Sequence, residues 1–178
     1  YPAPGSKWLV NLVCDAVTEA EVRVDHAWGL DHGTWSVLLP MFPNAQIPVI
    51  QLSLDRKQDG AYHYALGQAL GHLRDECVLI LGSGNLVHNL RTASFNDSAL
   101  DWAVSFDEFV KNWTLQGDHS PMINYEKQGR EATLAINSAE HFLPYLYVLG
   151  ACTPEDPVTF FNEKVTLGSV SMRCVQFG

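Results

Sequence analysis

The sequence predicts an α/β fold in which helices flank a central mixed β-sheet, formed as a single domain over residues 1–178. Two runs rich in leucine and β-branched residues, "IPVIQLSL" at 47–54 and "CVLILGS" at 77–83, have the length and composition of buried strands. Between them, residues 61–75 have apolar positions three and four apart, which indicates a helix. A strand, a helix and a strand in this order form a right-handed crossover, so we expect two parallel strands side by side.

The elements before this unit are predicted from capping residues and apolar spacing. Ser6 can cap a helix that continues to Ala16, and residues 22–24 alternate with charged residues as a short strand does. "DHG" at 31–33 then precedes a short apolar helix, which the prolines at 40 and 43 are expected to end.

The elements after the unit follow from the same signals. We expect a helix over 98–116, a polar loop over 117–136 and an apolar helix over 139–151 with Pro144 in or just before its first turn. Residues 158–161 and 170–177 resemble an antiparallel strand pair.

Composition narrows the classes of function. The net charge of −9 and the absence of any basic stretch longer than Arg56-Lys57 argue against a nucleic-acid partner. No apolar run approaches the ~20 residues of a membrane span. The four cysteines are scattered among apolar neighbours and are expected to be reduced core residues. These features predict a cytoplasmic protein without a membrane partner.

Position along the chain sorts the seven histidines into two groups. His32, His88 and His141 each begin or end a predicted element, which is where an α/β fold collects its functional site. The other four lie among polar residues and are expected to be ordinary exposed side chains: His26, His63, His72 and His119.

His88 follows the second predicted central strand and a turn that contains Gly82 and Gly84. The two glycines allow a sharp turn and a close approach of other groups to the backbone. An imidazole titrates near pH ~6.5, so His88 suits a general acid or base. The alternative that spacing leaves open is a buried, hydrogen-bonded histidine or a helix cap.

Other chemical interpretations of the motifs are weaker. The glycine-rich turn has no lysine after it for a phosphate loop, and Ser83 lacks the glycine spacing of a nucleophile elbow. Glu140 and His141 begin an apolar helix and could reach a metal, or Glu140 could simply offset the helix dipole. Spacing alone does not choose between these two.

Three ordered motifs together resemble the class III extradiol ring-cleaving dioxygenases, in particular the branch similar to 4,5-DOPA dioxygenase. They are "GLDHGTWSVLLPMFPNAQIPVIQLSLD", "LILGSGNLVHNLR" and "AEHFLPYLYVLGA". The resemblance extends from "YPAPGS" at 1–6 to "GSVSMRCVQFG" at 168–178. It implies the phosphorylase/hydrolase-like arrangement of the catalytic subunit in that class.

The resemblance also implies an activity and roles for three histidines. A non-haem metal, iron(II) as expected or zinc as the other candidate, would bind a small DOPA-like catechol, and both atoms of dioxygen would enter the opened ring. His88 matches the acid/base and could also be a metal ligand. His32 matches a second catalytic histidine, and His141 matches the last metal ligand.

The family pattern has two further metal-binding histidines in an amino-terminal segment, and this chain has no match for them. We therefore expect such a segment to be missing, and a complete centre to need it, or another copy in a homo-oligomer, as a partner. Two alternatives stay open: an inactive fragment or non-catalytic binding or scaffold relative on the same fold, and a zinc hydrolase.

Overall fold

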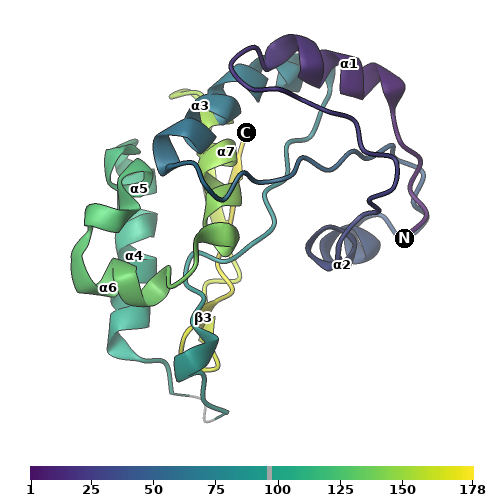
Figure 1. Ribbon diagram of the computed structural model, residues 1–178. Coiled ribbons are helices and arrows are strands. Elements are labelled where there is room, and N and C mark those ends of the chain that lie inside the picture. Colours follow the sequence, from purple (N-terminus) through teal and green to yellow (C-terminus); the bar gives the residue numbers. More distant parts are fainter. Residues whose placement is uncertain (96–97) are drawn as a thin grey trace.

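The computed structural model describes residues 1–95 and 98–178, which form helices around a central pair, α3 and α7 (Figure 1). Helix α1 lies on one side of this pair, whereas α4, α5 and α6 lie on the other. The α-helices are α1 (Lys7–Ala16), α2 (His32–Met41), α3 (Gly60–Leu70), α4 (Asp101–Gln116), α5 (Ser120–Ile123), α6 (Gly129–Ala135) and α7 (Leu143–Ala151). Within the described ranges, none of them has the length and apolar character needed to cross a bilayer.

The first two helices begin where their caps predict. Ser6 Oγ accepts a hydrogen bond from Leu9 N–H (3.1 Å), and a carboxylate oxygen of Asp31 accepts one from Thr34 N–H (2.9 Å). Each bond satisfies an amide that a helix start otherwise leaves free. Pro40 lies inside the last turn of α2, and the helix ends at Met41, between the two prolines that were expected to end it.

Helices α3 and α7 pack with their backbones almost in contact, because each has a glycine at the crossing. A Cβ atom on Gly67 would lie 2.3 Å from Tyr147 O, and one on Gly150 would lie 2.2 Å from Tyr64 O. Helix α3 continues into the 3-10 turn η1 (Gly71–Glu76), as the apolar pattern over 61–75 predicts. The helix predicted over residues 61–75 is thus confirmed. The predicted placement of Pro144 in the first turn of α7 is confirmed as well.

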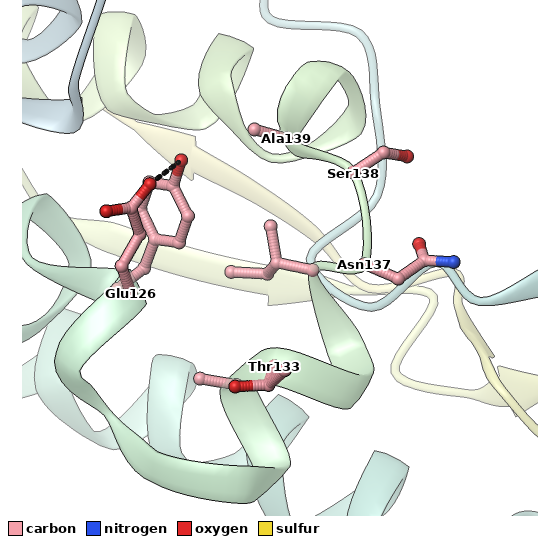
Figure 2. Close-up of a pocket in the computed structure, with 8 residues that line it drawn as sticks. Glu126, Thr133, Asn137, Ser138 and Ala139 are labelled. Atoms are coloured by element: carbon pink, nitrogen blue, oxygen red, sulfur yellow. Dashed lines mark hydrogen bonds between the residues drawn. The ribbon is translucent and has the colours of Figure 1, made fainter.

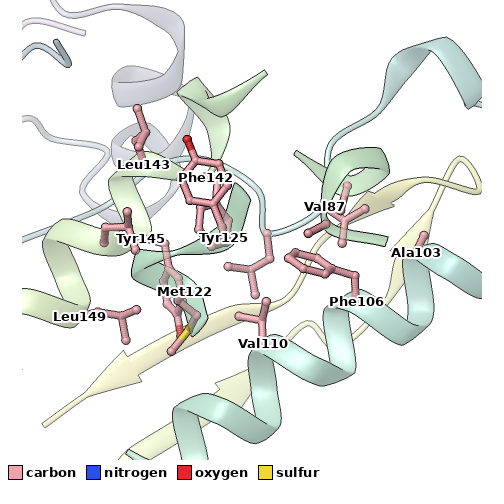
Figure 3. Packing of buried hydrophobic residues seen from close by; sticks show 14 residues of the cluster. Val87, Ala103, Phe106, Val110, Met122, Tyr125, Phe142, Leu143, Tyr145 and Leu149 are labelled. Carbon is pink, nitrogen blue, oxygen red and sulfur yellow. The ribbon is translucent and has the colours of Figure 1, made fainter. Parts of the chain in front are cut away.

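The larger core cluster lies between α4, α5, α6 and α7 (Figure 3). Phe106 and Val110 of α4 face Met122 of α5 and Leu149 of α7, and all four are almost completely buried. The predicted polar loop over 117–136 is therefore wrong. It contains α5, η3 (Tyr125–Lys127) and α6, since its few apolar side chains find partners in this core.

The strands form two small antiparallel sheets. β1 (Val158–Phe161) pairs with β4 (Cys174–Phe177), and β2 (Val165–Thr166) pairs with β3 (Val170–Ser171). The predicted antiparallel pair is confirmed, with its second strand divided into β3 and β4. The chain is a mixture of helices and strands, as predicted, but its sheets are small and do not form a central layer.

Residues 47–54 and 77–83, which we call the extended segments, are not strands, and neither are residues 22–24. In the described residues, neither extended segment pairs with another strand. Val49 N–H donates to Pro4 O, Cys77 N–H to Arg74 O as the cap of η1, and Val78 N–H to Leu73 O. Leu79 is 66% exposed. A strand needs a neighbour for its amides and carbonyls, so the predicted crossover sheet does not form here.

A buried ion pair joins the strand region to α4. Arg173 donates to Asp107 Oδ2 from Nε (2.8 Å) and from Nη2 (2.5 Å), and both side chains are almost fully buried. Ser171 Oγ donates to the other oxygen of Asp107 at 2.5 Å. The guanidinium also contacts Glu108 and Glu163. We call α3 together with residues 98–178 the packed half, and this network is its polar centre.

Candidate functional site

His88 is held between two segments that are distant in the sequence. Its backbone forms a parallel bridge with Ile136 and an antiparallel bridge with Val170. The N–H of His88 donates to Ala135 O at 2.9 Å. A residue fixed from both sides presents its side chain in one direction, so the imidazole of His88 is a positioned group.

The ring of His88 stacks on the ring of His141, with 3.6 Å between ring centroids and 13° between planes. His141 ends the 3-10 turn η4 (Ala139–His141), just before α7. Gly84 allows this approach, because a Cβ atom there would lie 2.1 Å from His141 O. The amide of the next residue, Asn85, donates to the same carbonyl at 3.0 Å. Gly84, four residues before His88 in the sequence, thus leaves room for the backbone of His141.

His32 is the first residue of α2 and is exposed. The start of α2 is tied to the glycine turn, because Ser83 Oγ donates to Gly33 O at 2.6 Å. His32 is also close enough to His141 for its positive charge to lower the pKa of that imidazole. The structure therefore brings the three predicted site histidines into one region. The hydroxyl of Ser83 donates its hydrogen to a backbone carbonyl, so this contact does not favour Ser83 as a nucleophile.

Both stacked histidines resist protonation. Burial lowers the pKa of His88, and Glu140 partly opposes this effect. Burial also lowers the pKa of His141, and positive charge on His88 or His32 would lower it further. Two imidazoles in face-to-face contact cannot both be charged at low cost. Both rings are therefore neutral near neutral pH and keep a lone pair for a proton or a metal.

Only one carboxylate oxygen of Glu140, Oε1, accepts a side-chain hydrogen bond, whereas the buried Oε2 has no hydrogen-bond partner among the described residues. Burial disfavours its charged form, but hydrogen bonds from its own backbone N–H and from Ser138 Oγ (2.9 Å) outweigh this effect and lower the pKa of the carboxyl. Arg56 lies 3.9 Å from its other oxygen. Glu140 thus stabilises the turn before His141, and its negative charge favours the protonated forms of His88 and His141.

The donors fit a metal ion only in part. His88 and His141 are neutral imidazoles, which zinc and iron(II) accept as ligands. However, across residues 1–95 and 98–178 no group of three or more His, Cys, Asp or Glu side chains is arranged to hold an ion. The chain therefore offers part of a ligand set, and a centre needs its full ligand count.

The remaining histidines only partly match the expectation of exposed side chains. His26 and His72 are exposed, as predicted. His63 is completely buried in α3, where Nδ1 lies 3.1 Å from Tyr147 Oη, and burial lowers its pKa. His119 is half-buried, with Nδ1 3.0 Å from Tyr64 Oη. The prediction was wrong for these two because both partners are tyrosines far away in the sequence.

A cavity of about 370 Å³ opens beside the site, between α6 and η4. Figure 2 shows Glu126, Thr133 and Ala139 around it on three sides. Ile136, which pairs with His88, also lines it. The cavity was not predicted from the sequence, since it lies in the segment taken for a polar loop.

Comparison with known proteins decides the family. The family described as "Catalytic LigB subunit of aromatic ring-opening dioxygenase" matches residues 1–176. The chain belongs to this family. It is thus an extradiol-type aromatic ring-opening dioxygenase by family and by its relatives, and the resemblance in the three sequence motifs is confirmed.

Two relatives and one solved structure are similar to this LigB-family chain over almost its whole length, which is 68–75% of their own. The 4,5-DOPA dioxygenase extradiol of Escherichia coli (strain K12) is 44% identical over 185 residues, covering 100% of this chain and 68% of that protein. The Beta vulgaris protein of the same name is 40% identical, covering 99% of this chain and 68% of its own length. A crystal structure of an uncharacterized protein from Escherichia coli K12 superposes with a TM-score of 0.93 at 44% identity, over 100% of this chain and 75% of that one.

Proposed function

We propose that this LigB-family chain cleaves a small DOPA-like catechol next to its diol, with His88 as the acid/base. The observation that carries the proposal is the stacked pair of neutral imidazoles, His88 and His141, on rigid backbone. Catechol ring opening requires a base for a hydroxyl proton and later an acid for an intermediate, and a neutral imidazole serves both steps. The names of the two relatives support the choice of substrate class.

His32 is the second catalytic histidine in this proposal. It begins α2, and the bond between Ser83 and Gly33 holds that helix end against the glycine turn. Its influence on the pKa of His141 supports a position facing the same substrate. Because His32 is exposed, it can contact a bound catechol or dioxygen without moving another side chain.

The proposed cofactor is iron(II), with zinc as the other candidate. His141 is its ligand in this chain, and His88 is an additional ligand only when no substrate is present, since an acid/base needs its lone pair free. Bound iron(II) would supply Lewis acidity to the diol and electrons to dioxygen. Two imidazoles are fewer than the three protein ligands of an open catalytic site. We therefore propose that the other ligands come from a further polypeptide segment or a second copy of the chain.

We also propose that the protein is cytoplasmic and has no nucleic-acid partner. Net charge of −9 disfavours phosphate backbones. The four cysteines are all free, as predicted, but none is a buried core residue: Cys77 is exposed, and Cys14, Cys152 and Cys174 are half-buried. We also propose that the extended segments, which are unpaired in this structure, become strands of a central sheet of phosphorylase/hydrolase-like order when a further segment or a second copy provides the neighbouring strand; their β-branched composition supports this.

The test is catechol turnover under ¹⁸O₂ by the protein as isolated and supplied with iron(II), with mass spectrometry of the product. We expect two labelled oxygen atoms in the ring-opened product. His88→Ala should lower turnover by about 10²–10⁴-fold, as expected when an acid/base is removed. His141→Ala should instead lower the metal content. The matched control is His72→Ala, since His72 is an exposed histidine whose Nδ1 lies 3.0 Å from Ala69 O, within its own helical turn.

Other outcomes would contradict either the whole proposal or the role of one residue in it. Turnover without dioxygen would indicate a hydrolase. Absence of both metal and turnover would indicate a non-catalytic relative. Full activity of His88→Ala would remove His88 from its role, and full metal occupancy in His141→Ala would remove His141 from the ligand set.

A further inference from the structure

Asn85 contacts His141 through both its backbone and its side chain. Its N–H donates to His141 O at 3.0 Å, and its Oδ1 lies 3.0 Å from His141 Nδ1. The amide nitrogen, Nδ2, donates to Ser171 O at 2.7 Å. The side chain therefore bridges the ring of His141 and the backbone of β3.

The bridge has only one chemically consistent proton arrangement. A backbone carbonyl can only accept, so the NH₂ group of Asn85 must face Ser171 O. The Oδ1 atom then faces His141, and it also can only accept, so Nδ1 of His141 must carry the hydrogen. In a neutral ring this leaves the lone pair on Nε2.

The amide of Asn85 cannot turn over without loss, because Ser171 is itself fixed. The N–H of Ser171 donates to Val87 O (2.9 Å), and Oγ donates to Asp107 Oδ1 (2.5 Å). Asp107 is held in turn by the buried guanidinium of Arg173. A flipped amide would place Oδ1 against Ser171 O, two acceptors without a proton between them, which is unfavourable.

We propose that Asn85 is a positioning residue that holds His141 in the tautomer protonated on Nδ1, with Nε2 free as the functional nitrogen. What Nε2 then binds rests on the proposed function; the tautomer does not. When one ring nitrogen of a histidine binds a ligand, the group that hydrogen-bonds the other ring nitrogen fixes both the tautomer and the orientation of the ring. Here that partner is anchored through Ser171 to the Arg173–Asp107 ion pair, so the polar centre of the packed half sets the proton position at the site.

The direct test is a long-range ¹H–¹⁵N correlation spectrum of the metal-free protein near pH 8, in which the two nitrogens of each neutral histidine give distinct patterns. The His141 pattern is assigned by its disappearance in His141→Gln. We expect the Nδ1–H form in the unsubstituted protein. Asn85→Leu should convert His141 to a mixture that contains the Nε2–H form, and should weaken Zn²⁺ binding, followed by titration, by about 10–100-fold.

Two further variants separate positioning from a general structural role. Asn85→Asp keeps an acceptor for Nδ1–H and should retain the tautomer. Asn89→Leu is the matched control, because Asn89 is a buried asparagine whose side chain bonds Leu134 O (2.8 Å), Arg91 N–H and Asn137 Nδ2, none of them an imidazole. It should reduce stability and leave the His141 pattern unchanged.

The proposal is overturned if the unsubstituted protein has the hydrogen of His141 on Nε2, or if Asn85→Leu leaves the pattern unchanged. The first result needs no variant to fold. Because the spectrum is recorded without metal or substrate, the expected tautomer combined with no catechol turnover would leave the role of Asn85 standing and remove the proposed function instead.

Discussion

Helix α7 and the extended segments are both rich in apolar residues, and the structure gives them opposite environments. In α7, Leu146 and Leu149 have no exposed surface. In the extended segments, Leu79 exposes 66% of its surface and Ile47 exposes 44%. Composition alone does not separate these two regions.

The difference lies in where each backbone finds its hydrogen bonds. A helix satisfies its own amides and needs only a surface to pack on, which α3 offers to α7 across Gly67 and Gly150. A strand needs another strand beside it for every amide that it contributes. Burial of an apolar segment therefore depends on the partner present, and three experiments can break or sharpen this conclusion.

The largest effect is expected at the polar centre of the packed half. Arg173→Ala should lower the free energy of unfolding by about 3–5 kcal/mol, because it leaves the buried carboxylate of Asp107 without its partner. Arg23→Ala is the control, since its ion pair with Glu21 is exposed, and it should cost at most about 1 kcal/mol. Urea unfolding measures both; similar small losses would show that the ion pair carries no special weight.

The next effect compares matched leucines in the two regions. Leu149→Ala should cost about 2–5 kcal/mol, because it opens a cavity in the packed half. Leu79→Ala should change stability by no more than about 0.5 kcal/mol, as an exposed side chain does. Chemical denaturation of the two variants provides the comparison. A large loss for Leu79→Ala would mean that the extended segments are covered in solution.

The smallest effect concerns pH and the buried imidazole of His63, which packs against Tyr62 and Tyr147 and lies near Asp55 and Asp59. Burial lowers its pKa below the ordinary value near 6.5, so the unfolded chain takes up this proton first as the pH falls. The stabilisation is therefore complete above about pH 6.5 and declines as the pH falls toward the lowered pKa of the folded state.

His63→Gln should reduce the slope of unfolding free energy against pH between about pH 7 and pH 5, measured by urea titrations at several pH values. His72→Gln is the control, because His72 is exposed and should leave the slope unchanged. An unaltered slope in His63→Gln would show that this histidine accepts its proton without opening the packed half.

Local signals in the sequence predicted much of the fold. The caps Ser6 and Asp31 mark helix starts that need only a few neighbouring residues, and Pro144 fits a first turn for the same reason. The strands at 158–161 and 174–177 were predictable because a nearby hairpin partner follows in the chain. The extended segments were not, because a β-branched run does not reveal whether a neighbour is present.

The same limit applies to the candidate site. Position at element ends selected His32, His88 and His141, which the structure brings together; their chemical roles remain predictions. Asn85 was missed, because its importance depends on Ser171, 86 residues further along. The available signal was a polar residue, Asn85, between Gly84 and the buried residues Leu86 and Val87. That signal does not indicate which distant residue Asn85 contacts.

The way Asn85 holds His141 has a consequence for the rate of folding. The contacts of Asn85 that shape the site join residues 56 and 86 positions apart in the chain. Closing such loops costs entropy before any contact is gained, and chains rich in distant contacts fold more slowly than those with local ones. We therefore expect α1 and α4 to form early and the histidine pair to meet only once residues 135–171 have folded back onto residues 84–88, so that the candidate site is the last part of the fold to form.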